Sequence, residues 1–315
     1  MLPRCHYTVP LPGTAPLQLG GRTLVMGIVN VTPDSFSDGG RCLDPDRAAD
    51  HAQEMEAGGA DLLDIGGEST RPGAAALSVE EELARVVPVL DRLAGRVRVP
   101  VSIDTYKAEV ARVALDHGAV IVNDVSGLLY EPALAAVVAE SGAALVLMHN
   151  RGRSRDMYRE AVYGVVGVEV AAELGDRIDA AIEAGVARSR IIIDPGLGFA
   201  KRAEHTYAAL AALGRLAPLD RPILVGPSRK SFLAGEGDGG PDDREWGTAA
   251  AVTAAVLEGA HIVRVHGVRE MVQVVSVADR VRAAGEAPSD TGEGDVMSHS
   301  SASPGSFSLS AATRG

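Results

Sequence analysis

The chain has 315 residues, of which 46% are hydrophobic and 23% charged, and its formal net charge is −12 at pH 7. This composition is that of a folded globular protein, and it excludes a chain that is disordered throughout. The acidic balance argues against nucleic acid as a partner, since such binding depends on a basic surface that neutralises phosphates. A site for an anionic ligand therefore requires a local cluster of cations.

The N-terminal segment lacks the apolar core of a signal peptide, and no apolar run reaches the ~18 residues of a membrane span. Cys5 and Cys42 are too few for a disulfide framework and have no spacing typical of zinc. These features indicate a cytoplasmic protein with no membrane partner. Residues 1–20 are interrupted by proline and glycine, and we expect an irregular lead-in with room for a short hairpin across the floor of the following domain.

From residue 24 to about residue 284 the sequence repeats one unit, in which a β-branched run, a Gly/Asp/Ser-rich turn and an Ala-rich helical segment follow one another. The eight strand-like runs are LVMGIVNV, DLLDIGG, VPVSIDT, VIVNDVSG, ALVLMHN, IIIDPG, PILVGPS and HIVRVHG. Apolar strands that alternate with helices indicate a parallel sheet covered by helices, and eight of them indicate a closed barrel. We therefore predict an α/β fold, a single (β/α)8 TIM barrel over residues 21–285. An open doubly wound sheet is the main alternative, but no G-x-G-x-x-G turn follows the first strand.

The C-terminal segment 286–315 lies outside the repeat. It is poor in large aliphatic residues and rich in Ser, Gly and Ala. Such a segment cannot bury enough apolar surface to order itself. We therefore predict a disordered C-terminal tail.

Polar residues follow almost every predicted strand, at the end where TIM barrels place their active sites. One group is cationic and suits phosphate or carboxylate; it comprises Arg71, Arg229, Lys230, Arg264 and His266. A second group offers hydrogen-bonding edges that suit a flat heterocycle; it comprises Asp104, Asn123 and Asp194. The two aspartates could instead be helix N-caps, and His149 could be a hydrogen-bonded core histidine.

Gly-rich loops follow the first, second, sixth and seventh strands. The first, between Val31 and Ala48, is longer than the ~2–6 residues usual for such connections and carries Phe36 at its tip. This length indicates a lid or a loop that grips the substrate. Glycine and proline could also serve only to form tight turns.

At these residues the sequence closely resembles the dihydropteroate synthase family. The stretches MGIVNVTPDSFSDGG (26–40) and DIGGESTRPGA (64–74) match its two signatures, and VSIDT, VNDVSG, DPGLGFAK, GPSRK and RVH follow in the family's order. The resemblance spans about residues 24–284. It implies an enzyme of folate biosynthesis that condenses 6-hydroxymethyl-7,8-dihydropterin diphosphate with p-aminobenzoate, giving 7,8-dihydropteroate and diphosphate. A pterin-binding methyltransferase and a non-catalytic pterin-binding paralogue are the alternatives, and the retained lid, SRK and RVH motifs favour the synthase.

The resemblance also implies a role for each matching position. The pterin ring would be held by Asp104, Asn123, Asp194 and Lys230, with Met148 as an apolar wall. The diphosphate would lie against Thr70, Arg71, Arg264 and His266, with Asn30 helping to hold Mg²⁺. The p-aminobenzoate would lie between Phe36, Pro72 and Phe199, with its carboxylate near Ser231 and the N-terminus of the following helix. The expected catalytic residues are Asp104, Lys230, Arg264 and His266, and the expected assembly is a homodimer formed through late helices.

Two positions depart from the family pattern. Gly267 follows the RVH motif where Asp or Asn is common. His149 is followed by Asn150 and Arg151 where an aromatic residue or Met is expected. We expect the first departure to affect a neighbouring loop and the second to alter the mouth of the pterin pocket.

Overall fold

Eight parallel strands form one sheet, in the order β8-β7-β6-β5-β4-β3-β10-β9. The computed structural model describes residues 4–32, 44–69, 75–153, 158–159, 161–234 and 240–286. The strands are β3 (Leu24–Asn30), β4 (Leu62–Gly66), β5 (Val101–Asp104), β6 (Ile121–Asp124), β7 (Ala144–Met148), β8 (Ile191–Asp194), β9 (Leu224–Val225) and β10 (Ile262–Val265). A parallel bridge between Ile193 and Ile223 connects the two ends of this order. The sheet is therefore a nearly closed barrel, and all eight predicted strands are confirmed.

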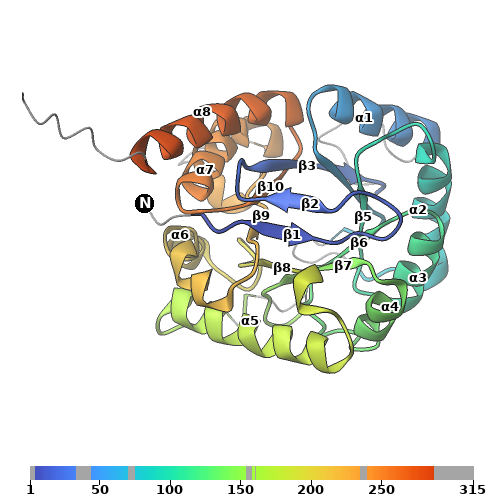
Figure 1. Ribbon diagram of the computed structural model, residues 1–315, viewed down its shortest axis with the longest axis horizontal. Helices are drawn as coiled ribbons and strands as arrows, with labels where there is room; N and C mark the ends of the chain where they lie inside the picture. Colours follow the sequence, from blue (N-terminus) through green and yellow to red (C-terminus); the bar gives the residue numbers. More distant parts are fainter. Residues whose placement is uncertain are drawn as a thin grey trace, which may run out of the picture.

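Helices surround the barrel on its outer side (Figure 1). They are α1 (Pro45–Ala57), α2 (Val79–Leu93), α3 (Ala108–Asp116), α4 (Leu134–Ser141), α5 (Val166–Glu183), α6 (Ala203–Ala211), α7 (Glu245–Leu257) and α8 (Val268–Glu286). Helix α2 shows why these segments are helical. Ser78 and Glu81 form a capping box at its start, and Val86 and Leu90 lie buried four residues apart on the face that packs against the sheet.

A hairpin covers the N-terminal end of the barrel. Strands β1 (Tyr7–Val9) and β2 (Leu17–Leu19) pair antiparallel and lie across the strands of the barrel in Figure 1. Val9, Leu17 and Leu19 on these strands, with Leu11 in the segment between them, pack against the N-terminal end of the barrel interior. Burial of each leucine contributes about 1.5–3 kcal/mol, so the hairpin closes the floor with apolar surface. The short hairpin expected in the lead-in is confirmed.

Alternation along the strands positions the site. Inward-facing residues near the N-terminal ends of the strands are apolar and form one core cluster with the hairpin, among them Leu62, Ile121, Val146, Ile192 and Ile262. Because side chains on a strand alternate, the residues two positions further along face the same interior. Those residues are Asp64, Asn123, Met148, Asp194 and Arg264. The fold therefore gathers polar side chains at the C-terminal mouth of an apolar barrel.

Some expectations concern residues outside the described ranges. The C-terminal tail, the first loop with Phe36, and Thr70, Arg71 and Pro72 in the second loop all fall there. Their structure stays a prediction. Over the ranges that the structure describes, no helix combines the length and apolarity needed to cross a membrane.

Candidate active site

Neighbouring strands bring the predicted pterin residues side by side. Asp104 at the end of β5 lies opposite Asn123 on β6, and Met148 at the end of β7 lies opposite Asp194 on β8. Asn123, Met148 and Asp194 are buried. The parallel register thus places four of the predicted ring contacts on one side of the barrel mouth.

Arg264 on β10 crosses the barrel interior and joins two carboxylates. Its Nε donates to Oδ2 of Asp64 at 2.6 Å, and a terminal nitrogen donates to Oδ2 of Asp104 at 2.6 Å. The Asn123 amide donates to the same Asp64 oxygen at 2.9 Å. Asp64 is fully buried on β4, so it fixes two side chains that face the mouth.

Burial and charge act in opposite directions on this pair. Burial raises the pKa of Asp104 to about 7, although Arg264 opposes the rise. Burial lowers the pKa of Arg264, but the Asp64 and Asp104 carboxylates outweigh that effect and raise it overall. Arg264 therefore stays charged, and Asp104 gains or loses its proton near neutral pH.

Lys230 and Phe199 meet at the mouth, and Lys230 interacts with Asp194 on β8. The Lys230 ammonium donates to the Leu197 carbonyl and lies 4.4 Å from the centre of the Phe199 ring. Burial lowers the pKa of Lys230 to about 8, and Asp194 opposes that shift. Gly198 has a φ of +77°, and a Cβ there would lie 3.2 Å from Lys230 Cδ, so this turn favours glycine.

His266 is held by hydrogen bonds on both ring nitrogens. Its Nδ1 lies 2.9 Å from Ser228 Oγ, and its Nε2 lies 3.4 Å from Nδ2 of Asn30. The structure therefore brings together Asn30 and His266, the residues predicted to lie nearest the metal and the diphosphate. Which ring nitrogen carries the proton depends on these two partners.

Two predicted neighbours point elsewhere. Arg229 has a φ of +57°, and its guanidinium forms ion pairs with Glu245 (3.3 Å) and Asp242 (3.2 Å), so it is directed toward α7. Ser231 is exposed and begins only a three-residue 3-10 helix, η4 (Ser231–Leu233). The α-helix that follows Ser231 is α7, which begins at Glu245, and the place of the p-aminobenzoate carboxylate near Ser231 and this helix stays a prediction.

The structure decides whether the two aspartates are helix N-caps and whether His149 is a core histidine. Lys107 is the N-cap of α3 and Arg202 is the N-cap of α6, so neither Asp104 nor Asp194 caps the helix that follows it. His149 is a buried, hydrogen-bonded histidine, as the alternative held.

The space next to Gly267 is taken by a neighbouring side chain. A Cβ at Gly267 would lie 2.2 Å from Oε1 of Glu245, whose other oxygen pairs with Arg229. Glycine at this position leaves room for Glu245 to approach. Asn150, the other departure, is fixed by hydrogen bonds: its amide donates to the Val125 carbonyl at 3.3 Å and to the Tyr130 hydroxyl at 3.1 Å.

Comparison with known proteins matches this arrangement to one family. The family described as pterin binding enzyme matches residues 26–266. A dihydropteroate synthase of Mycobacterium leprae is 50% identical over 260 residues, covering 80% of this chain and 91% of the relative. The chain belongs to the dihydropteroate synthase family. Members of this family are transferases, and the match favours the synthase over the pterin-binding methyltransferase.

Solved structures of dihydropteroate synthases share the fold. The Xanthomonas albilineans enzyme with 4-aminobenzoic acid superposes with a TM-score of 0.81 at 44% identity, covering 89% of this chain and 99% of that one. The Burkholderia cenocepacia enzyme complexed with 7,8-dihydropteroate has a TM-score of 0.79 at 42% identity, with 89% and 98% covered. The TIM barrel predicted from the repeat is thus the fold of known dihydropteroate synthases.

Sequence reasoning missed Asp64 as a member of the site. It lies inside the signature DIGGESTRPGA, within a strand that is otherwise apolar, LLDIG. A charged residue in a buried strand needs a partner, and that requirement is the signal that could have identified it. Its partners, Arg264 and Asn123, come from two other strands, so the sequence does not name them.

Proposed function

We propose that this chain condenses 6-hydroxymethyl-7,8-dihydropterin diphosphate with p-aminobenzoate, with release of diphosphate. The main support for the proposal is the position of Arg264, whose guanidinium donates hydrogen bonds to both Asp64 and Asp104 at the mouth of the barrel. A guanidinium has five N–H donors, so hydrogen atoms remain for a diphosphate oxygen after both carboxylates are bound. One side chain can thus connect the ring pocket to the anion.

The pterin ring is assigned to the buried side of the mouth. Asp104, Asn123, Asp194 and Lys230 present the donors and acceptors that a pterin edge requires, and Met148 supplies an apolar surface. Buried carboxylates beside the ring stabilise a pterin cation more than the neutral ground state. The C–O bond to the diphosphate therefore breaks with Asp104 and Asp194 next to the developing positive charge.

The diphosphate is assigned to Thr70, Arg71, Arg264 and His266. Mg²⁺ at Asn30 is part of the proposal. Asn30 would hold the metal, and diphosphate oxygens would supply further ligands of the kind that Mg²⁺ prefers. The Asn30 amide fits this, because its nitrogen faces His266 and its carbonyl oxygen is a ligand that Mg²⁺ accepts. When bound, Mg²⁺ neutralises charge on the departing diphosphate.

The amine side of the reaction is assigned to the loops that carry Phe36, Pro72 and Phe199, with Ser231 near the carboxylate. The Xanthomonas albilineans relative with 4-aminobenzoic acid supports this substrate. An arylamine is neutral at pH 7, so it attacks the exocyclic carbon without a general base. The product amine then loses its extra proton to solvent.

Release of diphosphate tests this chemistry. We expect release with both substrates and Mg²⁺, little release without p-aminobenzoate, loss of release with a chelator, and recovery with excess Mg²⁺. Equal diphosphate release with and without p-aminobenzoate would contradict a condensation and indicate a hydrolase. Equal release with and without the chelator would contradict only the assignment of Mg²⁺.

A homodimer through late helices is supported by apolar exposure on α7 and α8, which lie side by side in Figure 1. Trp246 is 88% exposed on α7, and Val277 is 61% exposed on α8. We expect sedimentation at twice the mass of one chain, and Trp246→Glu to shift the protein toward the monomer. A wild-type protein that sediments as a monomer at micromolar concentration would contradict this assembly.

The cytoplasmic location of the protein stays a prediction from the sequence.

A further inference from the structure

Lys201 is a buried lysine that the proposed chemistry leaves without a role. It is the last residue of the motif DPGLGFAK, which begins at the end of β8, and it is only 1% exposed. Its Nζ lies 2.8 Å from Nδ1 of His149 and donates to the carbonyls of Gly196 and Phe199, each at 3.1 Å. Three acceptors match the three N–H groups of an ammonium, whereas a neutral amine has only two. The geometry therefore favours the charged form.

The carbonyls that Lys201 binds belong to the loop between β8 and α6. The loop backbone is constrained, because Ala200 has a φ of +46°, a conformation that residues with a side chain rarely adopt. Gly196 has a φ of +65°, and a Cβ there would lie 2.0 Å from the His149 carbonyl oxygen. A backbone held in these conformations needs fixed contacts around it, and Lys201 supplies two of them.

The same loop carries groups of the proposed site. The Leu197 carbonyl accepts a hydrogen bond from Lys230, and the Phe199 ring lies under the Lys230 ammonium. Lys201 thus binds the Gly196 and Phe199 carbonyls of the loop, while Lys230 binds the Leu197 carbonyl between them. A shift of this loop would move the Phe199 ring, which is assigned to p-aminobenzoate.

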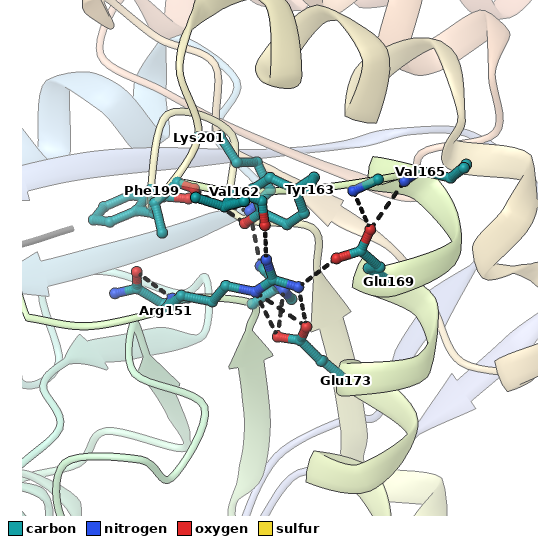
Figure 2. Close-up of polar contacts among 12 residues, drawn as sticks. Arg151, Val162, Tyr163, Val165, Glu169, Glu173, Phe199 and Lys201 are labelled. Atoms are coloured by element: carbon teal, nitrogen blue, oxygen red, sulfur yellow. Dashed lines mark hydrogen bonds and ion pairs between the residues drawn. The ribbon is translucent and has the colours of Figure 1, made fainter. Parts of the chain in front are cut away.

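His149, which accepts from the Lys201 ammonium, is itself hydrogen-bonded to a row of charged side chains. The His149 Nε2 lies 3.1 Å from Oε2 of Glu173 on α5, and Arg151 joins Glu173 to Glu169. Figure 2 shows the Arg151 guanidinium beside both carboxylates, with Lys201 and Phe199 nearby. Burial and the Lys201 charge lower the pKa of His149 to about 4, so the ring is neutral at pH 7. Its Nδ1 therefore accepts from Lys201 while its Nε2–H donates to Glu173.

We infer that Lys201 is a positioning residue for the amine substrate, whose ammonium holds the β8–α6 loop so that Phe199 forms one wall of the p-aminobenzoate pocket. The inference rests on the proposed function. It assigns no contact between Lys201 and either substrate. Its main effect is on the amine pocket, because the pterin contacts Asp104 and Asn123 lie on β5 and β6, away from this loop.

The charge of Lys201 also predicts a pH dependence. The groups that face it are His149, Tyr163, Glu173 and Arg151 on one side and Asp194 and Lys230 on the other. Burial lowers the pKa of Lys201 to about 7, against the opposing effect of Asp194. As pH rises through this range the ammonium loses a proton and one of its three hydrogen bonds. The loop is then held less firmly, so the KM for p-aminobenzoate should rise on the alkaline side.

Lys201→Met tests the inference, because methionine keeps the length and removes the charge. We expect the KM for p-aminobenzoate to rise about 10-fold or more, since small displacements of substrate-positioning groups have large effects. The KM for the pterin diphosphate should change less than about twofold, and the alkaline rise should disappear. Arg202→Met, an exposed neighbour, is the matched control and should behave as wild type.

His149 offers a second pair of variants if Lys201→Met does not fold. His149→Gln keeps an acceptor for Lys201 and a donor for Glu173, so it should retain a nearly normal KM for the amine. His149→Leu removes both and should raise that KM. Equal changes in the two KM values, or a wild-type KM for p-aminobenzoate that does not vary between pH 6 and pH 9, would overturn the inference while the synthase activity stands. A wild-type protein that forms no dihydropteroate would overturn both.

Discussion

Asp104→Asn is expected to lower kcat by about 100- to 1,000-fold, the usual effect of removing a group that stabilises transition-state charge. The affinity for the pterin diphosphate should change only a few-fold, because asparagine keeps the shape and one acceptor oxygen. The carboxylate is needed as the C–O bond breaks, when positive charge develops on the ring. Steady-state kinetics and calorimetric titration of the pterin diphosphate measure the two effects separately.

The pH profile gives Asp104 a second readout. Burial raises the pKa of Asp104 to about 7, so the carboxylate takes up a proton as pH falls through that value. The anionic form is the active one, and kcat should therefore fall on the acid side and recover as pH rises. Asp104→Asn should lack this acid limb. Asp116→Asn, an exposed change on the following helix, is the control. Equal losses in binding and turnover would contradict a role in the transition state.

Arg264→Met is expected to lower both activity and stability. The change leaves the carboxylates of Asp64 and Asp104 without their cation inside the barrel, and removal of one partner of a buried ion pair costs about 3–5 kcal/mol of the free energy of unfolding. Loss of the link to the diphosphate should reduce kcat/KM by about 1,000-fold. Urea denaturation and steady-state kinetics measure the two effects.

Two controls separate these effects. Arg264→Lys keeps the charge but lacks the planar fork that reaches both carboxylates, so it should be more stable than Arg264→Met while remaining poorly active. Arg22→Met removes a surface pair with Asp61, and its cost should be only about 0–1 kcal/mol. If Arg264→Met unfolds at the same urea concentration as Arg22→Met, the buried pairs do not stabilise the fold as inferred.

The fold could be predicted from the sequence because each unit carries its own local pattern. A β-branched run, a Gly-rich turn and an amphipathic segment recur eight times, and every run forms a strand. Strand ends in such a barrel share one face, so the residues at those ends could be named in advance. Asp104, Asn123 and Asp194 are examples, and the register brings the first two side by side.

Other parts of the site depend on contacts that strand position does not determine. The motif GPSRK places Arg229 next to Lys230, and only the left-handed backbone at Arg229 directs its side chain toward α7. Lys201 lies beyond a strand end in a Gly-rich loop, where a lysine is expected to be exposed. It is buried because that loop folds back over the end of β7, a long-range contact that no local pattern predicts.

Formation of the condensed product is the most direct test of the proposed function. The purified protein is incubated with 6-hydroxymethyl-7,8-dihydropterin diphosphate, Mg²⁺ and ring-labelled p-aminobenzoate, and the products are analysed by mass spectrometry. We expect labelled 7,8-dihydropteroate, with one diphosphate released for each product formed, and no labelled product when either substrate is left out. A folded protein that binds the pterin diphosphate yet forms no labelled product would contradict the assignment.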